Sequence, residues 1–131
     1  MLNRRTLIGT LAAAAAISLT AVASATSPQT FDAKAFAAAQ NAGKPILLHI
    51  TAPWCPTCKA QTPILSKLEA QPKFKNLAVL NIDFDTSKPL LRKLHVAQQS
   101  TLIVYKGKQE AGRSTGDTNA ASIESLLDKA I

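Results

Sequence analysis

The chain has 131 residues, of which 47% are hydrophobic and 18% are charged. This length and composition suit one domain with a buried core and exclude an intrinsically disordered chain. Lys and Arg number 15 against 8 acidic residues, which gives a net charge of +7 at pH 7. The basic residues form no run of five and do not alternate with aromatic residues, so we expect no nucleic-acid partner.

The first 25 residues have the pattern of a signal peptide. Arg4 and Arg5 precede an apolar run, Leu7–Val22, and Ala23-Ser24-Ala25 resembles a signal-peptidase site. The run is shorter than the roughly 20 residues of a membrane span, which favours cleavage after Ala25 over the alternative, an uncleaved membrane anchor. The paired arginines also fit a twin-arginine signal. We therefore expect residues 26–131 to form one domain in an oxidising compartment outside the cytoplasm, such as the periplasm.

The rest of the chain alternates between helical and strand patterns. Helical patterns cover Thr30–Ala42, which ends before Gly43, then Lys59–Ala70, Leu90–Leu94 and Asn119–Lys129, the last with Asp117 or Asn119 as its cap. Strand patterns cover Ile46–Ile50, Leu77–Asp83 and two segments near Thr101 and Gln109. This order predicts an α/β fold, with a mixed central sheet and helices on both faces.

The cysteines, Cys55 and Cys58, lie in the segment Trp54-Cys55-Pro56-Thr57-Cys58. A disulfide stabilises a protein more when it closes a longer loop, so a purely structural role explains this pair poorly. A zinc site needs four ligands, and His49 and His95 do not stand at finger spacing. Cys58 is followed by Lys59 and not by His, which excludes the haem-attachment motif. Redox chemistry is the favoured interpretation, and copper(I) binding by the two thiolates is its rival.

The cysteine pair stands between the buried strand pattern Ile46–Ile50 and the amphipathic helical pattern Lys59–Ala70. Pro56 suits the first turn of that helix. Cys55 is therefore expected at the helix N-terminus, where the helix dipole and the free N–H groups favour a thiolate. Cys58 is expected to be more buried and less reactive. Such a pair can exchange disulfides, since one sulfur attacks and the other resolves the mixed disulfide.

Residues 30–130 resemble the thioredoxin superfamily. The resemblance is carried by the strand Ile46–Ile50, the segment Ala52–Lys59 (APWCPTCK), Pro63 at the position of a helix-kinking proline, the strand Leu77–Asp83, the hairpin segment Thr101–Lys108 and Gly116. It implies a thioredoxin-like fold and a monomeric thiol–disulfide oxidoreductase that acts on protein disulfides with no cofactor and no metal. It also implies, for a reductase, a membrane-embedded thiol transporter as redox partner.

Three positions depart from the family pattern. Ser100 stands where the family has a cis-proline, and a cis bond before a non-proline residue costs about 2.5–4 kcal/mol, so we expect a trans bond and a differently shaped loop. The family loop keeps metals off the cysteines, so this change leaves the copper(I) alternative open. His49 occupies the place of a buried aspartate beneath the second cysteine, and Val79 replaces a lysine. His49 is expected either to accept the Cys58 proton or to be a core histidine bonded to backbone.

Four residues are expected to contact substrate: Trp54, Pro56, Thr57 and Ser100. Trp54 is expected to cover the sulfurs or to pack at the strand end, and Thr57 either donates to the Cys55 thiolate or is an exposed spacer. His95 is expected to be solvated. Oxidases of the family often carry a histidine between the cysteines, so the uncharged Pro56-Thr57 favours a reductase. A module that binds partners without catalysis is the other alternative.

Overall fold

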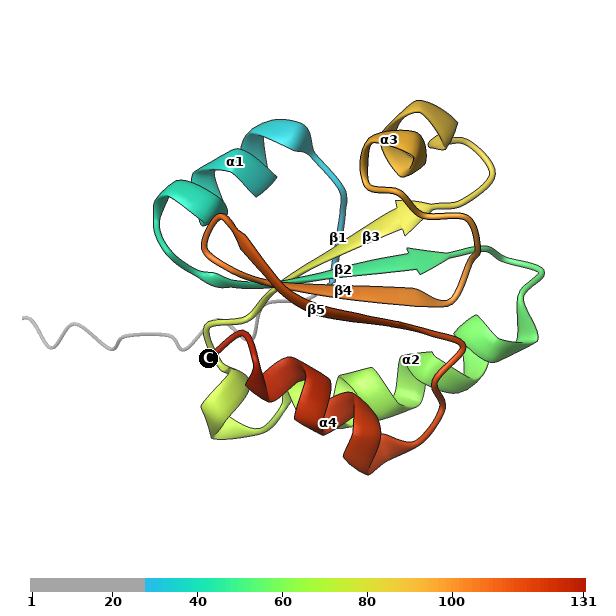
Figure 1. Cartoon of the computed structure of the whole chain (residues 1–131). Helices are drawn as coiled ribbons and strands as arrows, with labels where there is room; N and C mark the ends of the chain where they lie inside the picture. Colours follow the sequence, from blue (N-terminus) through green and yellow to red (C-terminus); the bar gives the residue numbers. More distant parts are fainter. Residues whose placement is uncertain (1–27) are drawn as a thin grey trace, which may run out of the picture.

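The structure, a computed structural model, describes residues 28–131, and the expected signal peptide lies outside this range. A five-stranded sheet with strand order β1-β3-β2-β4-β5 forms its centre (Figure 1). The strands are β1 (Gln29–Thr30), β2 (Pro45–Thr51), β3 (Ala78–Asp83), β4 (Thr101–Lys106) and β5 (Gln109–Thr115). Strands β1, β3 and β2 are parallel, whereas β4 is antiparallel to both β2 and β5. The expected mixed sheet is confirmed.

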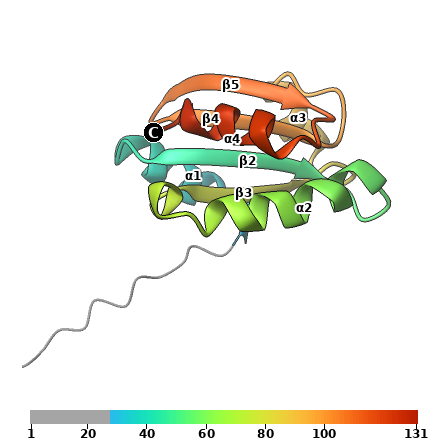
Figure 2. The ribbon, with the colours of Figure 1, turned by 90° about the horizontal axis from the view of Figure 1, so that it is seen from below.

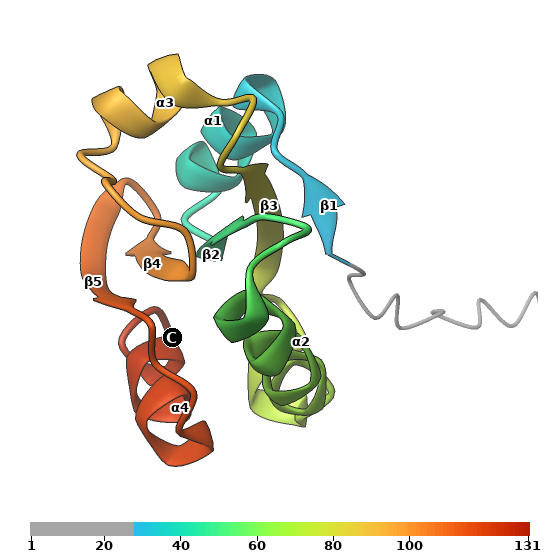
Figure 3. The ribbon, with the colours of Figure 1, turned by 90° about the vertical axis from the view of Figure 1, so that its right-hand side faces the viewer.

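Helices cover both faces of the sheet, as expected. They are α1 (Ala33–Asn41), α2 (Pro56–Glu69), α3 (Lys88–Lys93) and α4 (Ala120–Asp128), with a 3-10 turn, η1 (Pro72–Phe74), after α2. Figure 3 shows α1 and α3 on one face and α2 and α4 on the other, and Figure 2, seen from below, shows α2 and α4 side by side in front of the sheet. Within residues 28–131, no helix is both long enough and apolar enough to cross a membrane.

Strand β2 is buried on both faces, as its continuous apolar pattern predicts. Alternate side chains of a strand point to opposite faces. Leu47 joins a core cluster with residues of α2 and α4, whereas Leu48 and Ile50 join a second cluster with residues of β3 and α3. His49, two residues after Leu47, therefore faces the α2 side of the sheet, which is the face that carries the site described below.

The predicted helix over Thr30–Ala42 is wrong at its start. Thr30 belongs to β1, which pairs in parallel with β3, and α1 begins at Ala33, where the Asp32 carboxylate accepts a hydrogen bond from the Ala35 amide at 2.7 Å. A strand of two residues has no periodicity of its own and exists through pairing with a distant segment. At the other end of the chain Asn119 is the cap of α4.

Candidate functional site

The two cysteines form a disulfide at the N-terminus of α2, with their Cα atoms 5.3 Å apart. Helix α2 begins at Pro56, which lies in its first turn as predicted, and Cys55 is its cap. The Cys58 amide donates a hydrogen bond to the Cys55 Sγ at 3.1 Å. The predicted place of Cys55 at the helix N-terminus is confirmed. A sulfur in this place is stabilised as a thiolate by the backbone N–H and by the helix dipole.

The expected difference in burial between the cysteines is wrong for the disulfide form, because each is only 1% exposed. The two cysteines form a small buried cluster with Ala52, and the half-buried Phe84 packs against this cluster. The two sulfurs are therefore distinguished by position. Cys55 caps the helix and accepts a backbone hydrogen bond, whereas Cys58 lies within the first turn of α2.

Trp54 presents the most exposed large apolar side chain among the described residues, at 54% exposure. Its indole Nε1 donates to the Asp85 Oδ2 at 2.8 Å. The loop that carries Asp85 is held by the Asp83 carboxylate, which accepts from the Asp85 amide and from the Thr86 amide and hydroxyl. Hydrogen bonds from Thr86 hold the pKa of Asp83 below its usual range. An anchored apolar ring next to Cys55 suits contact with a substrate chain, but the covering of the sulfurs by Trp54 stays a prediction.

The other predicted substrate residues differ in exposure. Pro56 is exposed, Thr57 is half-buried and Ser100 is buried. The recorded donor to the Cys55 Sγ is the Cys58 amide, and a bond from the Thr57 hydroxyl to the thiolate form stays a prediction. His95 is exposed after the end of α3, as expected.

Ser100 shapes the loop before β4 through its backbone. The described residues contain no cis peptide bond, which confirms the expected trans bond, and the Ser100 φ is +54°. A left-handed conformation costs a non-glycine residue about 1–2 kcal/mol. The Ser100 carbonyl accepts from the Gly116 amide at 2.9 Å and from the Gln61 Nε2 at 3.1 Å, and its hydroxyl donates to the Gln99 carbonyl. These bonds offset the cost and leave the Ser100 side chain turned to its own loop.

Gln61 is a site residue that the sequence analysis missed. It is fully buried, and its Nε2 donates both to the Ser100 carbonyl and to the Asp117 carbonyl, at 3.1 and 2.9 Å. Carbonyl oxygens only accept, so the amide nitrogen must face them and the Oε1 must face the His49 Nε2, 3.1 Å away. Gln61 thus brings together two predicted site residues, His49 and Ser100. The signal was available, because Gln61 lies on the buried stripe of α2 that includes Leu65 and Leu68.

The contact with Gln61 determines which nitrogen of His49 carries the proton. An amide oxygen only accepts, so the neutral imidazole must donate from Nε2, which leaves the lone pair on Nδ1. Burial lowers the pKa of His49 below its ordinary value, although hydrogen bonds from the charged ring to Gln61 and Asn81 oppose this. The ring is therefore neutral at neutral pH. The partner of its Nε2 is a side chain, so the alternative of a histidine bonded to backbone is wrong at this nitrogen.

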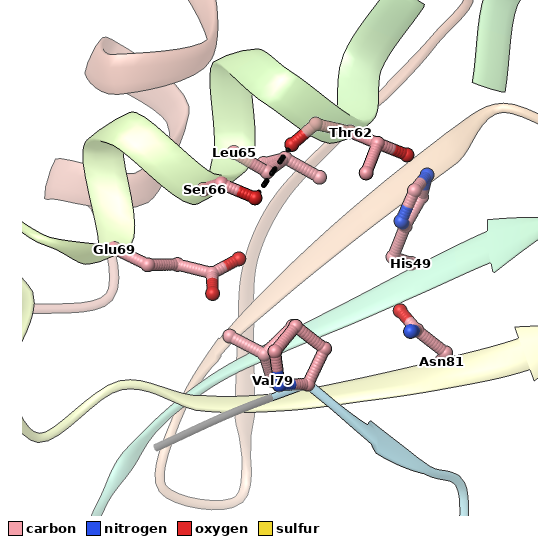
Figure 4. Close-up of a pocket in the computed structure, with 8 residues that line it drawn as sticks. His49, Thr62, Leu65, Ser66, Glu69, Val79 and Asn81 are labelled. Carbon is pink, nitrogen blue, oxygen red and sulfur yellow. Dashed lines mark hydrogen bonds between the residues drawn. The ribbon is translucent and has the colours of Figure 1, made fainter. Parts of the chain in front are cut away.

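A small pocket lies between α2 and the sheet, on the side of His49 (Figure 4). Its volume is about 40 Å³, and it is lined by Pro28, His49, Thr62, Leu65, Ser66, Glu69, Val79 and Asn81. Figure 4 shows the Glu69 carboxylate reaching into the pocket from α2, across from His49 on β2. Burial raises the pKa of Glu69 to about 7. Val79, which lines the pocket from β3, places no cation beside this carboxyl group.

The raised pKa of Glu69 predicts that this residue destabilises the fold at alkaline pH. Its folded pKa of about 7 lies above the ordinary value of 4.5, so the folded state holds a proton that the unfolded state has lost between these two values. Stability therefore falls as the pH rises from 4.5 to 7. Glu69→Gln should stabilise the protein at pH 8 by about 1–2 kcal/mol, a figure reduced because solvent screens a half-exposed carboxylate. Urea unfolding at both pH values measures this, and an equal gain at pH 4.5 would contradict it.

Among the described residues, no three His, Cys, Asp or Glu side chains lie close enough together to form a metal cluster. A copper(I) ion at this site would therefore depend on Cys55 and Cys58 alone. Two-coordinate binding by soft thiolates is a geometry that copper(I) accepts.

Comparisons with known proteins agree with this geometry. The thioredoxin family model matches residues 24–129. The chain is 42% identical to Trxlp from Edwardsiella tarda EIB202, whose crystal structure superposes with a TM-score of 0.75 over 77% of this chain and 98% of that one. It is 32% identical over 84 residues to a thioredoxin of Chlamydia trachomatis, covering 64% of this chain and 80% of that protein. It is 30% identical over 92 residues to a bifunctional thioredoxin reductase/thioredoxin of Mycobacterium leprae, covering 70% of this chain but only 20% of that longer protein. With its fold and its Cys55–Cys58 disulfide, this chain belongs to the thioredoxin family.

Proposed function

We propose that this chain is an exported protein-disulfide reductase in which Cys55 attacks the substrate and Cys58 resolves the mixed disulfide. A Cys-x-x-Cys disulfide in a thioredoxin-family fold supports thiol–disulfide exchange in general. The observation that carries the assignment of roles is the hydrogen bond from the Cys58 amide to the Cys55 Sγ at the helix N-terminus. This bond stabilises a thiolate on Cys55, which is the nucleophilic form.

In the proposed reaction the enzyme starts as a dithiol with Cys55 ionised. The Cys55 thiolate attacks one sulfur of the substrate disulfide and displaces the other sulfur, which takes a proton from solvent. The Cys58 thiol then gives up its proton, attacks the Cys55 sulfur and displaces the second substrate sulfur as a thiolate. Two electrons pass to the substrate, and the enzyme is left with the Cys55–Cys58 disulfide seen in the structure. A redox partner must return two electrons for the next turnover.

His49 is the proposed acceptor of the Cys58 proton. The His49 ring is neutral at neutral pH, and its basic Nδ1 is not bonded to Gln61. The His49 side chain faces α2 and contacts Gln61, which lies one helical turn after Cys58. A neutral imidazole can take a proton from a thiol as it becomes a nucleophile. The Asn81 Oδ1 is buried without a protein partner, so it offers an acceptor to the Nδ1–H of the charged ring.

His49→Leu should slow the resolving step about 100-fold at pH 8 and leave the attack by Cys55 unchanged. Stopped-flow mixing of the reduced protein with an aromatic disulfide such as DTNB separates the two steps, since each releases one coloured thiolate. Circular dichroism checks the fold, because the variant leaves the buried Gln61 Oε1 without its partner. A resolving rate that is unchanged from pH 6 to pH 8 would remove His49 from the mechanism.

Insulin reduction tests the enzymatic assignment. We expect multiple turnovers when dithiothreitol or a reductase supplies electrons. Tight copper(I) binding without turnover would favour a copper module, and the absence of both would favour a protein that only binds partners. The copper alternative rests on the Ser100 loop, because Ser100 replaces the proline of the family loop that keeps metals off the cysteines.

The proposed reducing direction rests on the uncharged residues between the cysteines, Pro56 and Thr57. Measurement of the reduction potential against glutathione tests it. We expect a reduction potential of about −270 mV, which is typical of thioredoxins. A potential of about −120 mV, which is typical of strong oxidants, would reverse the assignment.

Export, with a membrane thiol transporter as redox partner, rests on the pattern of residues 1–25. Fractionation of cells and N-terminal sequencing for cleavage after Ala25 test it.

A further inference from the structure

Two titratable side chains face one another across the pocket between α2 and the sheet. His49 enters from β2 and Glu69 from α2 (Figure 4). The other described residues of the lining do not titrate: β3 contributes Val79 and Asn81, α2 contributes Thr62, Leu65 and Ser66, and Pro28 precedes β1. The pocket therefore contains one base and one acid, and no other charged side chain of the described residues lines it.

The pocket suits water. Its volume of about 40 Å³ exceeds the roughly 10–15 Å³ that one water needs. Its wall carries polar groups, among them the Asn81 Oδ1, which is buried and has no protein partner. A buried oxygen without a partner is costly unless water or another donor reaches it. The Ser66 hydroxyl donates to the Thr62 carbonyl and keeps its lone pairs for a further donor.

We propose that this pocket is a proton-exchange route, in which Glu69 transfers protons between His49 and solvent through pocket water. The inference rests on the proposed role of His49 as acceptor of the Cys58 proton. In the reductive direction the His49 Nδ1 takes that proton and becomes an imidazolium. The imidazolium passes a proton through water to the Glu69 carboxylate, and the resulting carboxylic acid releases it to solvent. No electrons move in this route, and both groups return to their starting forms.

Geometry and acidity both favour Glu69 for this task. Its carboxylate is half-buried, so it is in contact with the pocket on one side and with solvent on the other. Burial brings the pKa of Glu69 up to about 7, and burial brings the pKa of His49 down from 6.5. The imidazolium is therefore the stronger acid of the two, and a carboxyl group with a pKa near the working pH can both take up its proton and release it. Because the charge of Glu69 destabilises the folded state at alkaline pH, stability does not explain the presence of a carboxyl group at this position.

The test compares Glu69→Gln with Glu124→Gln, which makes the same change of charge on α4, where Glu124 pairs with Lys73. The resolving phase of the DTNB reaction is followed from pH 6 to pH 9. In the wild type we expect its rate to rise with an inflection near pH 7, as Glu69 ionises. Glu69→Gln should lose this inflection and be about threefold to tenfold slower at pH 8, less than the roughly 100-fold loss that follows removal of a general base. The attack phase should not change, and Glu124→Gln should behave as the wild type.

A second measurement does not depend on catalysis. NMR of the imidazole nitrogens should detect the ionisation of Glu69 near pH 7 as a shift of the wild-type His49 signals, and this shift should be absent from Glu69→Gln. An unchanged titration of His49 would overturn the coupling across the pocket. A wild-type pH profile in Glu69→Gln, with His49→Leu still slow, would overturn the route and leave the proposed function standing. An unaffected His49→Leu would overturn both the catalytic role of His49 and the route that depends on it.

Discussion

Cys55→Ala should reduce insulin reduction to the uncatalysed background, a loss of at least about 10³-fold, whereas Cys58→Ala should stop the reaction at a mixed disulfide. The difference follows from the helix N-terminus. Cys55 accepts the Cys58 amide hydrogen bond and holds its charge there, so it attacks first. Cys58 lies within the first turn of α2, and its place in the mechanism begins only after the mixed disulfide has formed.

The stoichiometry of the DTNB reaction separates Cys58→Ala from the wild type. The reduced wild type should release two coloured thiolates per chain and end as the Cys55–Cys58 disulfide. Cys58→Ala should release one and retain the other as a mixed disulfide on Cys55, which mass spectrometry detects directly. Both replacements put a small apolar side chain where Ala52 and Phe84 pack, so they form a matched pair. Equal reactivity of the two variants would show that the helix N-terminus does not distinguish the sulfurs.

Mixed disulfides trapped by Cys58→Ala also identify the substrates. The exposed Trp54 ring, held by Asp85, lies next to Cys55 in the chain and offers an apolar contact to a bound polypeptide. Proteins recovered with the variant and released by reductant would be those whose disulfides reach this surface.

Strand β2, helix α2 and the place of Cys55 at the helix N-terminus could be predicted because their causes lie in neighbouring residues of the chain. A continuous apolar run predicts the central strand β2, and Pro56 suits the first turn of α2. The start of α1 was wrong because β1 consists of two residues that pair with β3, about fifty positions away in the chain. The burial of Cys55 was missed for the same reason, since Phe84, which packs against the cluster that contains Cys55, follows β3.

The surroundings of His49 could be predicted only in part. Its unusual place, six residues before Cys55, drew attention to it, but its partners come from other segments. Gln61 lies 12 positions away in the chain, and the Gln61 amide is itself oriented by carbonyls 39 and 56 positions further on. Spacing places Gln61 on the buried stripe of α2, but it does not show which groups converge on it. The pocket that joins His49 to Glu69 likewise exists only where β2, β3 and α2 meet.

Gln61→Leu should lower the free energy of unfolding by about 3 kcal/mol, although leucine fills nearly the same space. The substitution leaves the His49 Nε2–H and the Asp117 carbonyl without partners, whereas the Ser100 carbonyl keeps its bond from the Gly116 amide. Each buried group that loses its partner costs about 1–3 kcal/mol. For a domain of this size the loss corresponds to a fall in Tm of about 12–24 °C, which calorimetry measures.

Gln61 accepts a hydrogen bond from His49 and donates hydrogen bonds to two carbonyls, and Gln61→Glu separates these two functions. A carboxylate still accepts from the His49 Nε2 but has no donor for the carbonyls of Ser100 and Asp117, so stability should fall at least as far as in Gln61→Leu. The negative charge should at the same time raise the pKa of His49, which NMR of the ring nitrogens detects. Gln109→Leu, on the exposed edge strand β5, is the control and should change stability by less than about 0.5 kcal/mol. If Gln61→Leu were no less stable than this control, the amide could not be what holds His49 and the Ser100 loop in place, and the proton on Nε2 would lose its structural basis.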